Sequence, residues 1–429
     1  MKLRSALATL AFALAAQAQA TDFGRVAFTE LRDPQPYQAL SAAQAEVFDL
    51  GLRVLNTQWV PAGTARAARI DGLGPLFNIG SCDGCHNNGA RGRGPQSTEE
   101  GEGPAPATLV MQLLGRGGGA DPVYGHAFNI AAIDGVEPEG AVTIRYASRA
   151  GRYPDGSPWA LRVPAYRITS LRDGELAPDT VRQPRLPPAL YGVGLLERIA
   201  DDRRLRWAAD PRARRDGIRG TAAGRFGWQG TSVSVAEQTA RAFSREMGLT
   251  SGLVASDDCT PAQERCRLPD GGTPEVSAEL FDALLAFQRY LAVPVVPRDA
   301  VGGGKAGAAL FTAAGCDLCH RPAATVRLDD GRLVAIAPYT DLLLHDLGEG
   351  LADRDGAGRV AASRWRTAPL WGIGLAPRAT EAAYLHDGRA VSLEQAVLWH
   401  DGEAAVSRRR FERFTAAERA RLLAWLAQR

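Results

Sequence analysis

The sequence lacks the features that mark a membrane-spanning or nucleic-acid-binding protein. After the first twenty residues, no apolar run reaches the roughly 20 residues that a membrane-spanning helix needs, so we expect no membrane span. Net charge is also small, because 50 Lys and Arg residues stand against 48 Asp and Glu residues. The arginine-rich runs at 212–215 and 408–410 are short, and we interpret them as solvated loops. Nothing here indicates binding to nucleic acid or to an anionic membrane.

The first twenty residues, MKLRSALATLAFALAAQAQA, are typical of a secretory signal peptide. Lys2 and Arg4 form a basic start, an apolar run follows, and Ala18-Gln19-Ala20 is a cleavage sequence of small residues. We therefore predict cleavage near Ala20 and a periplasmic or secreted location for the mature protein.

Four of the six cysteines lie in two Cys-x-x-Cys-His motifs. A zinc site would need four ligands from close partners, and no second Cys or His pair lies near either motif. An exported dithiol would tend to oxidise. A histidine directly after the pair is the signature of c-type haem attachment, in which the histidine binds iron. The sequence thus predicts two covalently bound haem c groups, the first on Cys82, Cys85 and His86, the second on Cys316, Cys319 and His320.

The other two cysteines, Cys259 and Cys266, have no neighbouring histidine. In an exported protein such a pair is typical of a structural disulfide, so we expect them to close a surface loop.

The chain repeats itself. A Leu-Phe pair precedes each Cys-Asp-x-Cys-His motif by the same spacing, and LYGVGL at 190–195 is echoed by LWGIGL at 370–375. FGWQGTSVSVAEQ from Phe226 aligns with YLHDGRAVSLEQ from Tyr384, which pairs Gly230 with Gly388 and Ser234 with Ser392. Each copy ends in an amphipathic helix, the first with Leu280, Leu284, Phe287 and Leu291 on one face, the second behind a capping box of Thr415 and Glu418.

From this repeat we predict a mainly α fold with two cytochrome-c-like haem domains that arose by internal duplication. A partly β insertion in the first domain is indicated by the strand-like runs at 141–146 and 161–168, and we expect it to lie against the second domain. The predicted division is a signal peptide at 1–20, a first haem domain at 21–139 and 230–297 that is interrupted by the insertion at 140–229, and a second haem domain at 298–429. A linker is expected within 292–305.

Several segments resemble the di-haem oxidoreductase family, also called thiol oxidoreductase-like, which belongs with the bacterial di-haem cytochrome c peroxidases. They are GLGPLFNIGSCDGCHNNGARGRGP, RFGWQG, YTDLLLHDLGEGLAD, RTAPLWGIGL and YLHDGRAVSLEQAVLWHDGEA, which together span about 50–405. The resemblance implies an N-terminal haem with an open iron position, where peroxide or dioxygen reacts, and a six-coordinate C-terminal haem that supplies electrons.

The second haem then needs a further ligand, which in relatives of this class is usually methionine. The three methionines are Met1, Met111 and Met247, and none follows Cys319. The candidates are His345, His386 and His400. We favour His386, because YLHDG resembles a YMHDG segment of the peroxidases, and we expect His345 to bond a haem propionate or the loop backbone and His400 to be structural.

The first haem has no such candidate. Trp228 aligns with His386 in the repeat, and an indole nitrogen only donates hydrogen bonds. We interpret His126, the only other histidine in that half, as a loop residue without haem contact. Trp228 could be a wall of the distal pocket, an electron relay between the haems or an ordinary core aromatic. Glu137 and Glu139, with Glu139 the more family-like, are candidate acid–base groups for peroxide or else exposed loop carboxylates.

The sequence predicts a periplasmic di-haem c-type oxidoreductase, peroxidase-like, with peroxide or dioxygen as oxidant. A small redox protein, a cytochrome c or a cupredoxin, would be the electron partner. The alternative is a di-haem electron carrier without substrate chemistry. Thiol oxidation has no chemical support, because both Cys-x-x-Cys pairs are assigned to haem.

Overall fold

The computed structural model describes residues 23–26, 33–64, 70–95, 101–266, 272, 274–295, 304–375 and 382–429. The predicted signal peptide at 1–20 and residues 296–303 of the predicted linker lie outside these ranges. Among the described helices, none is long and apolar enough to cross a membrane.

The expectation of a mainly α, cytochrome-c-like fold was wrong. Only 32% of the chain is helical and 22% is strand, distributed over many small sheets. The strands are not confined to the predicted insertion, because the second half contributes β14 to β19. The repeated motifs form only short helices, and the segments that connect these motifs pair with one another as strands.

The first half is built on α2 (Ala42–Asn56), α3 (Cys82–Cys85), α4 (Val193–Glu197), α7 (Val235–Met247) and α8 (Ala278–Tyr290). α2 and α8 pack closely, with the Phe48 and Phe287 ring centres 5.1 Å apart. Gly51 permits this approach, since a Cβ there would lie 2.1 Å from the Ala283 carbonyl oxygen. The predicted amphipathic face of α8 is confirmed, because Leu284, Phe287 and Leu291 are buried in the core.

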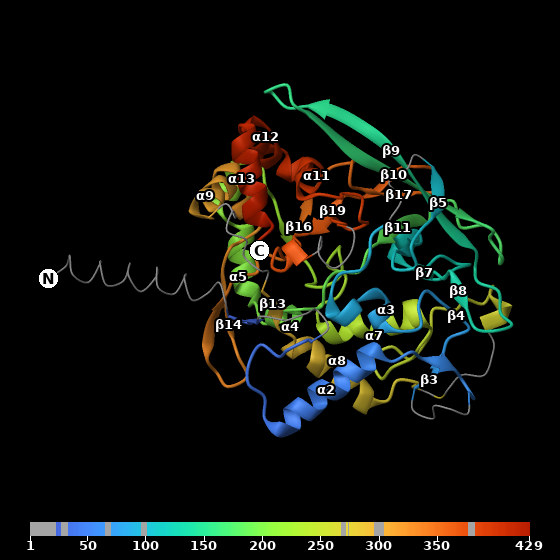
Figure 1. Cartoon of the computed structure of the whole chain (residues 1–429). Coiled ribbons are helices and arrows are strands. Elements are labelled where there is room, and N and C mark those ends of the chain that lie inside the picture. The colour runs from blue at the N-terminus through green and yellow to red at the C-terminus, as the bar shows by residue number, and fades with distance from the viewer. Residues whose placement is uncertain are drawn as a thin grey trace.

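The second half carries α9 (Gly304–Ala314), α11 (Leu393–Leu398), α12 (Ala405–Arg413) and α13 (Ala416–Leu426). Figure 1 shows these orange and red helices above the blue and gold α2 and α8. The capping box predicted from Thr415 and Glu418 opens α13. Two further helices, α5 (Asp201–Ala208) and α6 (Pro211–Arg215), lie within the predicted insertion at 140–229.

A long hairpin follows one side of the molecule (Figure 1). It consists of β9 (Ala141–Arg152) and β10 (Pro158–Thr169), with β5 (Glu102–Pro104) beside β9, and it confirms both predicted strand segments. Near its tip, the Tyr153 hydroxyl donates to Glu394 at 2.8 Å, and Arg419 pairs with Asp155 at 2.8 Å. The hairpin therefore contacts the second half.

Two sheets join the halves. One has the order β18 (Val360–Ala362), β17 (Asp353–Asp355), β11 (Val181–Arg185), β6 (Val110–Leu114) and β7 (Ala127–Phe128). The other runs β12 (Thr221–Ala222), β16 (Leu343–Asp346) and β19 (Arg364–Arg366). The remaining pairs are β1 (Arg25–Val26) with β13 (Val293–Pro294), β2 (Val60–Pro61) with β3 (Asp71–Leu73), β4 (Leu76–Phe77) with β8 (Ala131–Ala132), and β14 (Ala324–Arg327) with β15 (Leu333–Ile336).

The sequence repeat is also a repeat of backbone structure. Isolated β-bridges join Phe226 to Ser232 and Tyr384 to Ala390, at equivalent positions. Ser234 and Ser392 then cap α7 and α11 in the same way. Gly227 has φ of 74° and its counterpart Leu385 has φ of 67°, a left-handed conformation that a leucine adopts at a cost. Trp228 and His386 therefore occupy matching places in the two copies.

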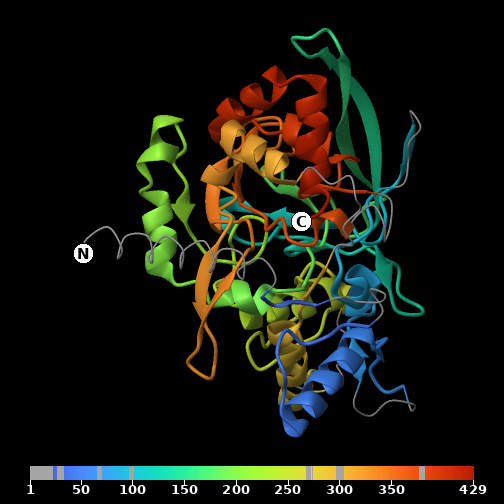
Figure 2. The same ribbon diagram turned by 60° about the vertical axis from the view of Figure 1, so that its left-hand side comes forward.

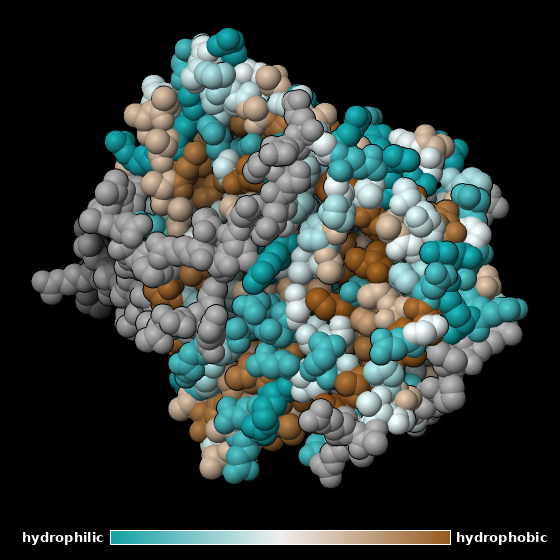
Figure 3. All heavy atoms as spheres, turned by 45° about the vertical axis from the view of Figure 1, so that its right-hand side comes forward, coloured by the Kyte–Doolittle hydropathy of each residue, from teal (hydrophilic) through white to brown (hydrophobic). Residues whose placement is uncertain are grey.

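The outer surface is largely polar. On the face drawn in Figure 3, hydrophilic residues surround smaller groups of hydrophobic ones. The buried apolar residues form two main clusters, one around Trp59, Phe243 and Phe287, the other around Trp399, Phe411 and Trp425.

We predict that one buried ion pair stabilises the junction of the halves. Arg185 on β11 pairs with Asp353 on β17, and both side chains are at most 7% exposed. Asp353→Ala leaves a buried guanidinium without its carboxylate, which should lower the free energy of unfolding by about 3–5 kcal/mol.

Urea unfolding of the holoprotein measures this loss. The control is Asp202→Ala, which breaks the exposed pair with Arg206 and should cost at most about 1 kcal/mol. Equal losses in the two variants would contradict the assignment.

Candidate functional site

The two Cys-x-x-Cys-His motifs form similar local turns. The backbone N–H of His86 donates to the Cys82 carbonyl at 2.7 Å, and that of His320 donates to the Cys316 carbonyl at 2.9 Å. Ser81 caps the first turn by accepting from Gly84 N–H. In each motif this turn brings both thiols and the histidine to one side of the chain.

Both motifs line one cavity of about 630 Å³. Its wall includes His86 and α7 from the first half, and His320 and α11 from the second. Side chains of both halves therefore face a shared interior space.

The donor set fits haem better than zinc or a redox dithiol. None of the four motif cysteines forms a disulfide, and burial raises the pKa of the Cys82 and Cys316 thiols to about 12, which disfavours an activated redox dithiol. Among the described residues, the one metal-like cluster is Cys319, Asp341 and His345, which lacks the fourth ligand of a structural zinc site. Burial lowers the pKa of His86 and His320 to about 4. Both imidazoles are thus neutral, which is the form that binds iron.

In the second half, two histidine rings each have their Nδ1 atom next to a backbone carbonyl oxygen. His320 Nδ1 lies 3.0 Å from the Tyr339 carbonyl oxygen, and His400 Nδ1 lies 2.7 Å from the Ala396 carbonyl oxygen. A carbonyl oxygen only accepts, so each Nδ1 carries the proton and each Nε2 has a free lone pair. Both rings are therefore in the tautomer that can bind a metal through Nε2.

The spacing of these two rings suits ligands on opposite sides of one metal ion. Their centroids are 6.5 Å apart, with the planes tilted by 52°. A metal–imidazole bond of about 2.0–2.1 Å on each side, together with roughly 1 Å from nitrogen to ring centre, gives a separation of about 6–6.5 Å. His400 is therefore a candidate partner of His320, beside the predicted His386.

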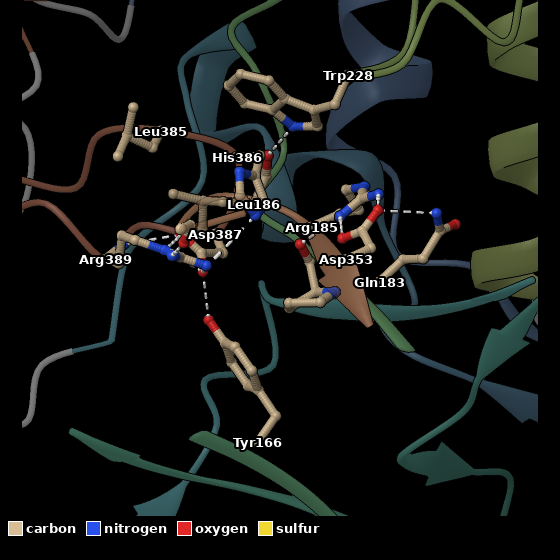
Figure 4. A network of polar contacts seen from close by, with 12 residues as sticks. Tyr166, Gln183, Arg185, Leu186, Trp228, Asp353, Leu385, His386, Asp387 and Arg389 are labelled. Carbon is tan, nitrogen blue, oxygen red and sulfur yellow. Dashed lines mark hydrogen bonds and ion pairs between the residues drawn. The ribbon is translucent and has the colours of Figure 1, made fainter. Parts of the chain in front are cut away.

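His386 has a different setting. Its ring stacks on Trp365, with centroids 3.8 Å apart and planes 12° from parallel, and its Nε2 is 3.8 Å from Asp387. It lines the cavity, and burial lowers its pKa to about 3. Figure 4 shows it within a polar network with Asp387 and Arg389. His386 remains neutral and packs flat against an aromatic ring.

His345 is held by two carboxylates. Its Nδ1 lies 2.9 Å from Glu403 and its Nε2 lies 3.0 Å from Asp341, so both ring nitrogens have partners within the protein. Burial would lower its pKa, but the Cys319 and Asp341 contacts outweigh burial and raise it well above the usual value. These partners differ from the propionate or backbone contact expected from the sequence.

Trp228 lies between the two motifs and is linked to His386 through one residue. Its indole N–H donates to the Leu186 carbonyl at 2.8 Å, and the Leu186 N–H donates to the His386 carbonyl at 2.6 Å, as Figure 4 shows for the indole bond. Trp228 also lines the cavity, and the Arg91 guanidinium lies over its ring at 5.3 Å. Trp228 is thus a wall of the cavity and part of a hydrogen-bonded connection across the halves.

One face of α7 borders the cavity near the first motif. Gln238, Ala242 and Glu246, four residues apart and therefore on one helix face, all line it. In the repeat, Ala242 corresponds to His400, and Gln238 corresponds to Ala396. The first copy thus has a methyl group where the second has an imidazole, with a polar amide one turn before it.

Glu246 was missed by our sequence analysis. Burial raises its pKa to about 7, an effect that the charge of Arg245 partly offsets. The structure gives its carboxylate no hydrogen bond or ion pair with another described residue. If the alignment that pairs Phe226 with Tyr384 had been extended without gaps along α7, it would have pointed to the helix face that carries Glu246.

The predicted candidate Glu139, and His126, which we interpreted as a loop residue without haem contact, are held by other side chains. Glu139 is 1% exposed, accepts from Asn129 and Gln263, and does not line the large cavity as far as the structure describes it. Burial raises its pKa to about 8. His126 lines the cavity but its Nδ1 lies 2.7 Å from Asp258. Glu137 is exposed and pairs with Arg172. Cys259 and Cys266, next to Asp258, form the expected disulfide.

Comparison with known proteins gives one match. Residues 216–428 match the family model described as "Di-haem oxidoreductase, putative peroxidase". Over these residues the chain belongs to the di-haem oxidoreductase family. No curated protein and no solved structure matches the chain.

In this di-haem oxidoreductase, the matched residues include the second motif, Trp228 and both α7 and α11. The first motif lies before the match. It lines the same cavity as the second motif.

We predict that the Glu246 carboxyl group titrates near pH 7. Because burial raises its pKa, the group should be neutral and show a carboxylic acid C=O stretch below about pH 7, and lose that band above it. Infrared spectra of the wild type minus those of Glu246→Gln across pH 5–9 measure this change, because the subtraction removes the band of Glu139, whose pKa is also raised by burial.

Glu246→Gln should lack the band, and Glu279→Gln, on the exposed side of α8, should retain it. A band that persists above pH 9, or one already lost at pH 5, would contradict the assignment.

Proposed function

We propose that this di-haem oxidoreductase is a c-type, peroxidase-like enzyme that reacts with peroxide beside the first motif and receives electrons at the second. One observation carries the proposal. Where the second copy presents the His400 imidazole to the cavity, the first copy presents the Ala242 methyl group. The two sites thus differ at the position from which a side chain could bind one side of a haem iron.

Each motif would hold one haem. Cys82 and Cys85 would form thioether bonds in the first half, and Cys316 and Cys319 in the second, with His86 and His320 as the proximal ligands. Bound haem would supply the redox-active iron at each site. His400 would complete the second site as a His/His pair, which is expected to have a lower potential than a His/Met pair.

Beside the first motif, the chain supplies the groups that a peroxide needs. The Gln238 amide can donate to one peroxide oxygen, and the Glu246 carboxylate can accept its proton. The carboxyl group can then return that proton to the departing oxygen as the O–O bond breaks, and this oxygen leaves as water. Reduction of the peroxide to two water molecules consumes two electrons, which the bound haems would supply and the donor protein would replace, and two protons from solvent. A pKa of about 7 suits both steps, because both forms of the group are present at neutral pH. Ala242 leaves room for the substrate.

The hydrogen-bonded connection through Trp228, Leu186 and His386 supports an electron path between the two sites. It crosses from the first copy to the second without a solvent gap, since the indole and backbone bonds are 2.8 and 2.6 Å long. We assign Trp228 two roles, as part of this electron path and as a wall of the first site. Glu139 is assigned a structural role, in which it supports the segment around Asn129.

A periplasmic location and a small redox protein as electron donor belong to the same proposal. The leader-like residues 1–20 and the Cys259–Cys266 disulfide support an oxidising compartment. Peroxide is the oxidant that the family description supports, with dioxygen as the other candidate.

We predict that His400, and not His386, sets the spin state of the second haem. His400→Ala should convert a low-spin signal to high-spin, because the iron loses its sixth ligand, and should raise that haem's reduction potential. Low-temperature EPR and potentiometric titration of the oxidised holoprotein measure both changes.

The matched variant is His386→Ala, which removes another imidazole that lines the same cavity. It should leave the spin state unchanged while both haems stay attached. The reverse pair of results would restore His386 as the ligand.

We predict that the first haem alone binds external ligands. Wild-type protein should carry two haems that survive denaturation, bind one cyanide per chain and react with hydrogen peroxide. Ala242→His should place a ligand over the first iron, make it low-spin and slow the peroxide reaction by at least about a hundredfold.

Ala236→His, on the same helix, is the control and should keep the reaction. Two low-spin haems in the wild type, with no response to peroxide, would instead establish an electron carrier. Haem extracted by acidified organic solvent would contradict covalent attachment.

A further inference from the structure

The two arginine-rich runs, which we interpreted as solvated loops, lie side by side on helices. The run at 212–215 falls in α6 and the run at 408–410 in α12. Asp216, directly after α6, pairs with Arg410 of α12. Figure 2 shows the green α5 and α6 helices projecting from the body of the molecule. Segments about 190 residues apart thus form one basic surface.

This surface carries more positive than negative charge. Between 201 and 219 the chain has seven arginines and four aspartates. All four aspartates are already bound to arginines, as in Asp210 with Arg321 and Asp216 with Arg410. Arg214 and Arg215 are exposed, and neither pairs with a carboxylate of any described residue. We call the exposed residues Arg206, Arg212, Arg214, Arg215 and Arg219 the arginine surface.

The arginine surface lies directly over the second motif. Beneath it, Ala213 and Ile218 pack against Leu318 and Cys319. Arg212 pairs with Asp317 at 3.2 Å, between the two motif cysteines in sequence, and Arg321 pairs with Asp210 at 2.7 Å. One layer of side chains therefore separates this surface from the atoms that would attach the second haem.

The same segment also exposes apolar area. Leu205 on α5 is 59% exposed, and Trp207 is half-buried beneath Arg203, whose guanidinium lies 5.9 Å from the indole centre. Apolar contact area with a charged periphery is the composition of small, transient protein interfaces.

We propose that the arginine surface docks a small electron-donor protein that carries an acidic face around its own redox centre. The inference rests on the proposed function, in which electrons enter at the second haem, and adds the place of entry and the charge of the partner. Positive charge over the entry point attracts an acidic partner over about 8 Å at physiological salt, which raises the association rate. The partner gives up one electron per encounter and leaves oxidised, and the second haem is reduced.

Stopped-flow reduction of the oxidised holoprotein tests this inference. The probe is a reduced acidic cupredoxin, and the variant is Arg214→Glu/Arg215→Glu. The second-order rate constant should fall at least about tenfold in the variant, and in the wild type it should fall as salt is raised. A basic cupredoxin should show neither the dependence on these residues nor the decrease with salt.

The matched control is Arg53→Glu/Arg172→Glu, the same charge change at exposed residues of α2 and of the segment after β10. It should retain the wild-type rate.

A neutral hydroquinone should reduce both variants at the wild-type rate, which shows that the second haem is intact. Equal rates for the two variants with the acidic cupredoxin would overturn the docking surface. Loss of the peroxide reaction in the wild type would instead overturn the proposed function, so the two failures are distinguishable.

Discussion

The structure depends on the attachment of β11 to β17. Arg185 and Asp353 form a buried ion pair across this junction, and Gln183 and Gln229 also donate to the same carboxylate. Removing a buried charge from water is costly unless its partners are close, so these contacts hold the halves in one relative position. That position lets the two motifs line one cavity and brings Trp228 next to the Leu186–His386 connection.

Within this frame, two copies of one backbone unit carry different chemistry. The turns before α7 and α11 share a β-bridge, a capping serine and a left-handed residue. The side chains that face the cavity differ, with Gln238 and Ala242 in one copy against Ala396 and His400 in the other. Replacing an imidazole by a methyl group leaves room on one side, and the nearby amide and carboxylate can bind a polar substrate there. Under the proposed function, duplication followed by a few substitutions would be sufficient to separate a reactive site from an electron-transfer site.

Burial sets the protonation of both sites. It lowers the pKa of His86 and His320 to about 4, which keeps them available as ligands, and raises the pKa of Glu246 to about 7, which suits a group that must accept and return a proton. Positive charge, in contrast, is concentrated outside the second motif, where solvent is accessible and long-range attraction can act on a partner.

The sequence by itself determined the motifs, the repeat, the disulfide pair, the hairpin strands and the capped helices, because each depends on residues that are near one another in the chain or that recur at fixed spacing. It did not determine the fold class, since strands such as β11 and β17 pair across about 170 residues and have no local signal. It also pointed to His386, which follows from motif likeness and stays a prediction, whereas the 6.5 Å spacing of His320 and His400, on which the proposed alternative ligand rests, exists only after folding. Only tertiary packing places the two arginine runs next to each other, because they are about 190 residues apart in the sequence.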